Sequence, residues 1–321
     1  MLYYKSGGLK GGMPSFRIKK RQMYISPCEI SQLKRVQTLL NQLHPQSALC
    51  ALVIPGSVLP HGDIVVLAGS FNPPTIAHLA LLKQAQKFAI QASPTGRPMH
   101  FYAAFSKRTV DKESVERPLL LDRILLLQTL LRRRLPDVGI LLFNRGLYVE
   151  QAEAIRASFP RVRRIFFLMG FDKIEQILDP RYYADRDAAL QALFQQAELL
   201  VAPRGKAHEH ELAELLDQPQ NRRFARFIHA LPFDSRYKDI SSTQLRQNGL
   251  AYAQDVPDEV RRFMRETRAY ASPVLRADGS VVDVYAERVR ALRQLLCSPV
   301  AWCIANKRCR ERRVLANSLL Q

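Results

Sequence analysis

The sequence predicts an α/β fold built on a doubly wound parallel sheet of about five to six strands. Three observations predict it. Short apolar runs alternate with amphipathic segments of helical length through the middle of the chain. Turns rich in Gly, Pro, Asn or charged residues follow these runs, as they do in βαβ units. The chain has 321 residues, of which 47% are hydrophobic, so it can bury a full core.

The apolar runs are expected to be the strands of a Rossmann-like sheet. They are Ile64–Ala68, Met99–Phe105, Val138–Phe143, Arg163–Met169, Glu198–Ala202 and Phe227–Leu231. The amphipathic segments are expected to be helices. They are Ser31–Leu43, His78–Ala92, Pro118–Arg134, a segment that ends near Ser158, Ala184–Gln196, Ser242–Asn248 and Pro257–Ala269. Since ligands of open parallel sheets bind beyond the carboxyl ends of the strands, the residues that follow the apolar runs are the candidates for a site.

Composition and charge divide the chain into three expected parts: a basic extension and linker over 1–60, the α/β domain over 61–271, and a basic helical extension over 272–321. The formal net charge is +19 and the isoelectric point is about 10.1. Residues 1–60 contain eight Lys or Arg and one acid, and residues 272–321 contain nine against four. Such a surface attracts polyphosphates, nucleic acid or anionic membranes, and net charge alone does not choose among them.

Cysteine usage and hydropathy bear on the compartment. The five cysteines show no CxxC spacing, and their odd number favours a reducing environment over a disulfide framework. No apolar run approaches the roughly 18–20 residues that span a bilayer, and the N-terminus lacks the apolar core of a secretion signal. We therefore expect a cytoplasmic protein with no membrane partner. The basic, acid-poor N-terminus leaves organelle targeting as an alternative.

The first motif is GSFNPPTIAH, from Gly69 to His78, which directly follows the first apolar run. A strand that enters a helix through such a turn favours anions, because unpaired backbone N–H groups and the helix dipole converge there. Thr75 and His78 are three residues apart at the helix entrance, so both side chains can face one bound phosphate.

The second motif is DISSTQLR, from Asp239 to Arg246. Its Ser241, Ser242 and Thr243 are typical of a helix N-cap, and Arg246 follows on the first turn. Two helix starts of this kind suggest a nucleoside triphosphate that is held from both sides.

Together the two motifs resemble the signatures of HIGH-type nucleotidyltransferases, and in particular those of the nicotinamide/nicotinate mononucleotide adenylyltransferase family. That family reads roughly GxFxPxT/HxxH and ISSTxxR. Thr75 stands where many members of the superfamily carry His, and the second motif is unbroken. The resemblance extends over about 64–270. It implies a nucleotidyltransferase domain over 61–271 that transfers AMP from ATP, with Mg²⁺, to a pyridine mononucleotide.

The resemblance also implies roles for the motif residues. His78 would donate to the α-phosphate, Thr75 would supply a hydroxyl group, and Arg246 would neutralise the leaving pyrophosphate. The acceptor phosphate is already ionised, so no general base is needed. The ATP-binding residues would be Gly69, Ser70, Phe71, Thr75, His78, Gly170, Asp172, Ser242, Thr243 and Arg246. Asp172, in the segment LMGFDK, would hold the adenosine ribose, although Phe171 replaces the small residue usual there.

A further set would bind the mononucleotide, with two aromatic rings enclosing the pyridine and cations near its phosphate. These residues are Ser70, Phe71, Lys107, Tyr148, Gln151, Tyr183 and Arg204. No protein ligands to a metal are implied. Two other functions stay open: the same transfer to another phosphate acceptor, such as phosphopantetheine or FMN, and a non-catalytic nucleotide sensor that binds nucleic acid. Oligomer formation is open as well.

Overall fold

The computed structural model describes residues 27–92, 99–107, 117–202, 206–237, 239–248 and 254–297. The chain divides into two compact units, one of Met1–Ser31 with Val300–Gln321 and one of Gln32–Pro299. Of the first unit, only residues 27–31 are described, and they begin helix α1. The second unit contains the rest of α1, the sheet and the other described elements.

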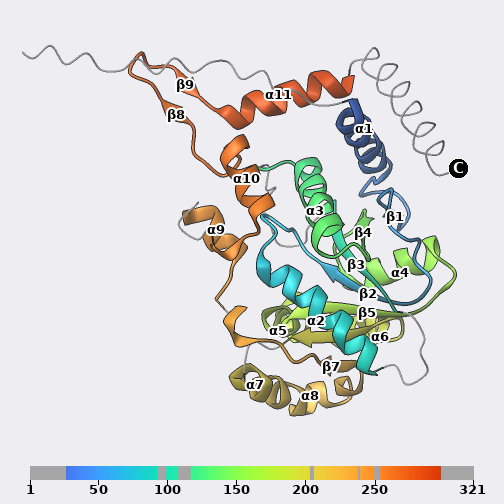
Figure 1. Ribbon diagram of the computed structural model, residues 1–321. Coiled ribbons are helices and arrows are strands. Elements are labelled where there is room, and N and C mark those ends of the chain that lie inside the picture. The colour runs from blue at the N-terminus through green and yellow to red at the C-terminus, as the bar shows by residue number, and fades with distance from the viewer. Residues whose placement is uncertain are drawn as a thin grey trace, which may run out of the picture. The chain divides into compact units, whose positions relative to one another are not determined.

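The centre of this unit is a seven-stranded, mainly parallel sheet, which confirms the expected α/β class (Figure 1). Its strands are β1 (Ala51–Val53), β2 (Gly62–Ala68), β3 (Met99–Ser106), β4 (Val138–Phe143), β5 (Val162–Gly170), β6 (Glu198–Ala202) and β7 (Ile228–Ala230). The middle strands are apolar on both faces because helices cover both: in β2, Ile64, Val65 and Val66 are each 0% exposed.

The strand order is β1-β4-β3-β2-β5-β6-β7, with every pair parallel except β1 with β4. The chain builds outward from β2 in one direction, through β3 and β4, and then from β5 in the other. The order therefore reverses between β2 and β5, which are hydrogen-bonded neighbours. In sheets of this kind the ligand binds at that switch point, beyond the carboxyl ends of the strands. The first motif follows β2 there, and the segment around Asp172 follows β5.

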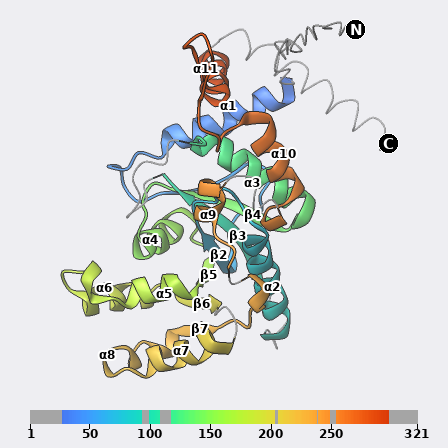
Figure 2. The same ribbon diagram turned by 90° about the vertical axis from the view of Figure 1, so that its left-hand side faces the viewer.

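Helices cover the two faces of the sheet, α2 and α3 on one side and α4, α5 and α6 on the other (Figure 2). The helices are α1 (Pro27–Gln42), α2 (Ile76–Ala92), α3 (Leu120–Arg134), α4 (Tyr148–Ser158), α5 (Phe171–Leu178), α6 (Arg186–Phe194), α7 (Lys206–Asp217), α8 (Pro219–Arg222), α9 (Ser242–Asn248), α10 (Asp258–Thr267) and α11 (Val284–Cys297). Short 3₁₀ turns lie at Pro180–Tyr182, Ala225–Phe227 and Ser235–Tyr237. None of the described helices combines the length and the apolar composition that a membrane span requires.

The structure adds elements that the sequence pattern does not predict. β1 lies in the segment expected to be a linker, and it pairs with the edge strand β4. Helices α5, α7 and α8 also appear, as does a small hairpin, β8 (Val274–Leu275) with β9 (Val281–Val282). β1 has three residues and the hairpin strands have two each, too few for an alternating pattern to be visible.

Helix α11 is fixed to α3 by a buried polar cluster. Asp122 of α3 is 2% exposed, and it accepts hydrogen bonds from the Tyr285 hydroxyl at 2.7 Å and from Arg288 Nη2 at 2.6 Å. The Tyr285 hydroxyl also accepts from the Leu119 backbone N–H at 2.7 Å, just before α3 begins. Part of the basic C-terminal extension therefore packs on the same unit as the sheet.

Candidate functional site

The turn between β2 and α2 is built around a buried phenylalanine. Phe71 has φ of 42°, in the left-handed region that non-glycine residues rarely adopt. Its ring is 0% exposed and packs against His78, with ring centroids 5.0 Å apart, and against Phe105, at 5.1 Å. The Gly69 backbone N–H donates to the Ala104 carbonyl at 2.9 Å, so the turn stays joined to β3. This packing holds an unfavourable backbone conformation in place at the switch point.

Thr75 and His78 cap the start of α2 reciprocally. The His78 backbone N–H approaches Thr75 Oγ1 at 3.4 Å, and the Thr75 backbone N–H donates to His78 Nδ1 at 3.1 Å. This is the geometry of a capping box with His in place of the usual Glu or Gln. Because Nδ1 accepts a backbone N–H, the neutral ring carries its proton on Nε2. The Thr75 hydroxyl is also 2.7 Å from Nδ1, and Thr75 is 1% exposed. Its side chain is therefore buried in contact with the His78 ring and helps to orient it.

The second motif contacts the first, although they are about 170 residues apart. The Ser242 hydroxyl donates to the Pro73 carbonyl at 2.9 Å. Arg246 Nη1 donates to the Asn72 carbonyl at 2.7 Å, and Arg246 Nη2 donates to Thr243 Oγ1 at 3.0 Å. Ser241 caps α9 by accepting the Thr243 backbone N–H at 3.2 Å. The structure thus brings the two expected phosphate-binding segments together at one end of the sheet.

Two cations lie at this junction without a carboxylate partner among the described residues. Arg246 donates only to carbonyl and hydroxyl oxygens, and Arg123 Nη1 donates to the Ser70 carbonyl at 3.0 Å. Burial lowers the pKa of Arg123, as does the charge of Arg246, while Tyr270 and Tyr285 oppose this shift. Two uncompensated guanidinium groups beside a helix start can hold a polyanion.

Three residues of this junction were not among the sequence candidates: Asn72, Arg123 and Tyr270. Asn72 is part of the first motif. It was not selected because its burial, at 1% exposed, cannot be read from the motif. Arg123 lies one turn into a long amphipathic helix, where nothing in the local pattern pairs it with Ser70. Tyr270 ends the stretch that resembles the family, which is the one signal that could have selected it.

The segment after β5 lies next to the first motif. Gly170 is the last residue of β5 and precedes α5, and Asp172 is exposed in the first turn of that helix. β2 and β5 are paired up to Leu67 and Leu168, so both segments leave the sheet side by side. The expected ribose contact of Asp172 stays a prediction.

Several residues expected around the mononucleotide form hydrogen bonds or ring contacts with other residues of the protein. Lys107 Nζ donates to the Leu40 carbonyl of α1 at 2.8 Å. The Tyr148 ring packs edge-on against Phe167 at 4.9 Å, and burial raises the pKa of its hydroxyl. Gln151 Nε2 donates to Ser106 Oγ and to the Gly146 carbonyl, each at 3.0 Å, while its Oε1 is buried without a hydrogen-bond partner. Gln151 therefore carries an acceptor with unused capacity near the ends of β3 and β4.

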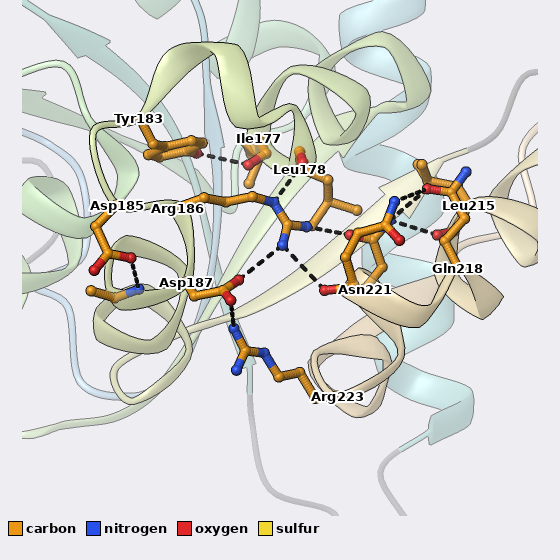
Figure 3. A network of polar contacts seen from close by, with 12 residues as sticks. Ile177, Leu178, Tyr183, Asp185, Arg186, Asp187, Leu215, Gln218, Asn221 and Arg223 are labelled. Atoms are coloured by element: carbon orange, nitrogen blue, oxygen red, sulfur yellow. Dashed lines mark hydrogen bonds and ion pairs between the residues drawn. The ribbon is translucent and has the colours of Figure 1, made fainter.

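Tyr183 lies between α5 and α6, where its hydroxyl donates to the Ile177 carbonyl at 2.7 Å (Figure 3). Burial raises the pKa of this hydroxyl. Beside it, Arg186 donates to the Leu178 carbonyl at 2.8 Å and contacts Asn221 of α8, so this region is a structural network joining three helices. Arg204 lies outside the described residues.

Among the described residues, no group of three or more His, Cys, Asp or Glu side chains could hold a metal ion. The site as described consists of backbone and hydroxyl groups, His78 and two arginines. This arrangement can bind phosphates and stabilise negative charge.

Comparison with known proteins gives little further. No protein-family model matches the chain, and no curated protein matches it. Among solved structures, it is similar to "Plasmodium falciparum nicotinic acid mononucleotide adenylyltransferase complexed with APC", with a TM-score of 0.43 and 14% identity. The match covers 65% of this chain and 98% of that chain. A likeness at this level leaves the function of this chain to be argued from its own residues.

Proposed function

We propose that this chain is an adenylyltransferase that transfers AMP from MgATP to the 5′-phosphate of nicotinamide or nicotinate mononucleotide. The observation that carries the proposal is the contact between the two motifs, through Ser242 to Pro73 and Arg246 to Asn72. A fold that brings these segments into contact at the switch point gathers hydrogen-bond donors and cations there. Such a site suits a reaction whose two substrates already carry the reacting phosphates.

In this mechanism an oxygen of the mononucleotide phosphate attacks the α-phosphorus of ATP in line. The bond from the α-phosphorus to the bridging oxygen breaks, and pyrophosphate leaves with that oxygen. His78, with its proton on Nε2, donates to the α-phosphate as negative charge develops. Arg246 neutralises the pyrophosphate, and Thr75 orients His78. Mg²⁺ enters with the nucleotide as part of the substrate.

The test is pyrophosphate release from MgATP with each acceptor added separately: nicotinamide mononucleotide, nicotinate mononucleotide, phosphopantetheine and FMN. We expect release with a pyridine mononucleotide and a loss of about 10²–10³ in kcat for His78→Ala. His210→Ala, an exposed histidine of α7, is the matched control and should leave the rate unchanged. Release with only a different acceptor would keep the mechanism and overturn the substrate. Binding of MgATP without release for any acceptor would favour a nucleotide sensor.

A further inference from the structure

Tyr270 connects the end of α10 to the turn of the first motif. Its hydroxyl donates to Asn72 Oδ1 at 2.8 Å, across 198 positions of sequence. Asn72 is 1% exposed, so this acceptor has no access to solvent that could replace the hydroxyl. Tyr270 lies outside both motifs. Its bond holds Asn72, the residue of the first motif that Arg246 of the second motif contacts.

Three of the polar groups of Asn72 form hydrogen bonds with three separate segments. Nδ2 donates to the Arg117 carbonyl at 3.4 Å, Oδ1 accepts from Tyr270, and the backbone carbonyl accepts from Arg246 at 2.7 Å. The Tyr270 bond therefore determines which side of the amide faces α10. A buried carbonyl oxygen without a donor raises the free energy of the folded state. Loss of the Tyr270 hydroxyl would therefore favour a rearrangement of the Asn72 side-chain amide toward another donor.

Tyr270 keeps its proton throughout the working range of pH. Burial raises the pKa of its hydroxyl, and Tyr285 and Asp122 act in the same direction, while Arg123 and Arg246 oppose them. The hydroxyl is thus a permanent donor, close to both uncompensated cations.

We propose that Tyr270 is a positioning residue that fixes the side-chain amide of Asn72 and, through the backbone carbonyl of the same residue, the guanidinium of Arg246. The inference rests on the proposed function, in which Arg246 neutralises the pyrophosphate. Arg246 has five N–H donors, and the contacts to Asn72, Ser242 and Thr243 use three of them. These contacts orient the remaining two, and a shift of the Asn72–Pro73 turn would move them relative to the phosphates.

The experiment compares Tyr270→Phe with Tyr102→Phe. Tyr102 also donates a hydroxyl hydrogen bond, to the Val58 carbonyl at 3.1 Å, and neither residue of that pair belongs to a motif. Both substitutions keep the ring and remove one oxygen. For wild type and both variants we would measure thermal unfolding, MgATP affinity by calorimetry, and kcat and KM for pyrophosphate release. We expect Tyr270→Phe to lower kcat about tenfold and to weaken MgATP binding several-fold, with the acceptor KM unchanged.

Tyr102→Phe should lower the unfolding temperature and leave the kinetics within twofold of wild type. If the two variants match in kcat and in MgATP affinity, Tyr270 has no positioning role and the inference is overturned. Wild-type protein that binds MgATP without turnover would overturn the proposed function alone, and the MgATP affinities would then decide the role of Tyr270. Absence of MgATP binding in the wild type would overturn both.

Discussion

At the scale of single residues, the reciprocal cap of Thr75 and His78 is the feature that links local folding to chemistry. Thr75→Val removes the hydroxyl that accepts the N–H of His78 and contacts its Nδ1. We expect the free energy of unfolding to fall by about 1 kcal/mol, as for other lost caps. We also expect kcat to fall about tenfold because the imidazole loses part of its orientation.

Thr75→Ser, which keeps the hydroxyl, is the control and should restore both values nearly to those of wild type. Urea unfolding and pyrophosphate release measure the two effects. A Val variant that loses stability but keeps full kcat would show that Thr75 only caps the helix.

The sequence predicts part of this site because a turn between a strand and a helix is a local signal. The Gly69–His78 turn and the Ser241 cap are formed as their residue types indicate. The bonds from Tyr270 and Arg123 to the turn join residues far apart in sequence, and no local pattern encodes them. For the same reason, the Lys107 contact with the Leu40 carbonyl could not be read from the end of a strand.

At the scale of secondary-structure elements, α11 is attached by a buried carboxylate, Asp122, and by an ion pair between Arg117 and Asp283 at its start. Asp122→Ala would remove the carboxylate that accepts hydrogen bonds from Arg288 and from the Tyr285 hydroxyl. Breaking a buried pair in this way typically costs about 3–5 kcal/mol, and we expect a loss of about 3 kcal/mol because the Arg288 side chain is 18% exposed.

Asp217→Ala is the matched control, since its pair with Arg222 is exposed on both sides and should contribute less than about 1 kcal/mol. Urea unfolding of the full chain measures both. A loss below 1 kcal/mol for Asp122→Ala would mean that α11 is held by its other contacts, which include the Arg117–Asp283 ion pair.

The elements themselves were predictable in proportion to their length and burial. Strands such as β4, in which every residue is buried, form continuous apolar runs and were placed correctly. β1 was not predicted, because its three residues form a strand through pairing with β4. Asn144 supports this strand, since its Oδ1 accepts the Cys50 backbone N–H at 3.0 Å. The hairpin strands Val274–Leu275 and Val281–Val282 pack on no core and are largely exposed, so hydrophobic patterning could not indicate them.

At the scale of the whole molecule, His100 near the amino end of β3 makes stability depend on pH, and His61 lies beside it. The rings of His61 and His100 have centroids 4.1 Å apart. Burial, and then the charge of His61, lower the pKa of His100 below its ordinary value of 6.5. The unfolded chain therefore binds this proton more readily than the folded protein. The contribution of His100 to stability is fully present above about pH 6.5 and is lost as the pH falls below it.

Urea unfolding at pH 7.5 and pH 5 should show this loss in the wild type. His100→Gln should make the difference between the two pH values smaller, whatever it does to stability itself. Lys87→Gln, at an exposed position of α2, keeps every histidine and should leave the difference unchanged. An equal difference in all three proteins would assign the acid sensitivity to other groups.

The net charge of +19 is the last whole-molecule property with a testable consequence. If the positive surface serves to attract a small polyphosphate substrate, few phosphates are contacted, and kcat/KM for MgATP should fall only several-fold between 50 and 200 mM salt. If it serves to bind nucleic acid, six to ten phosphate contacts would lower affinity by about 10³–10⁵ over the same range. Turnover of MgATP and binding of a single-stranded RNA, each measured at both salt concentrations, separate the two.

We expect turnover to persist at 200 mM, where RNA binding is lost. Strong RNA binding at 200 mM together with no turnover would reverse the assignment, because the uncompensated Arg123 and Arg246 would then serve a nucleotide that the protein senses and does not convert.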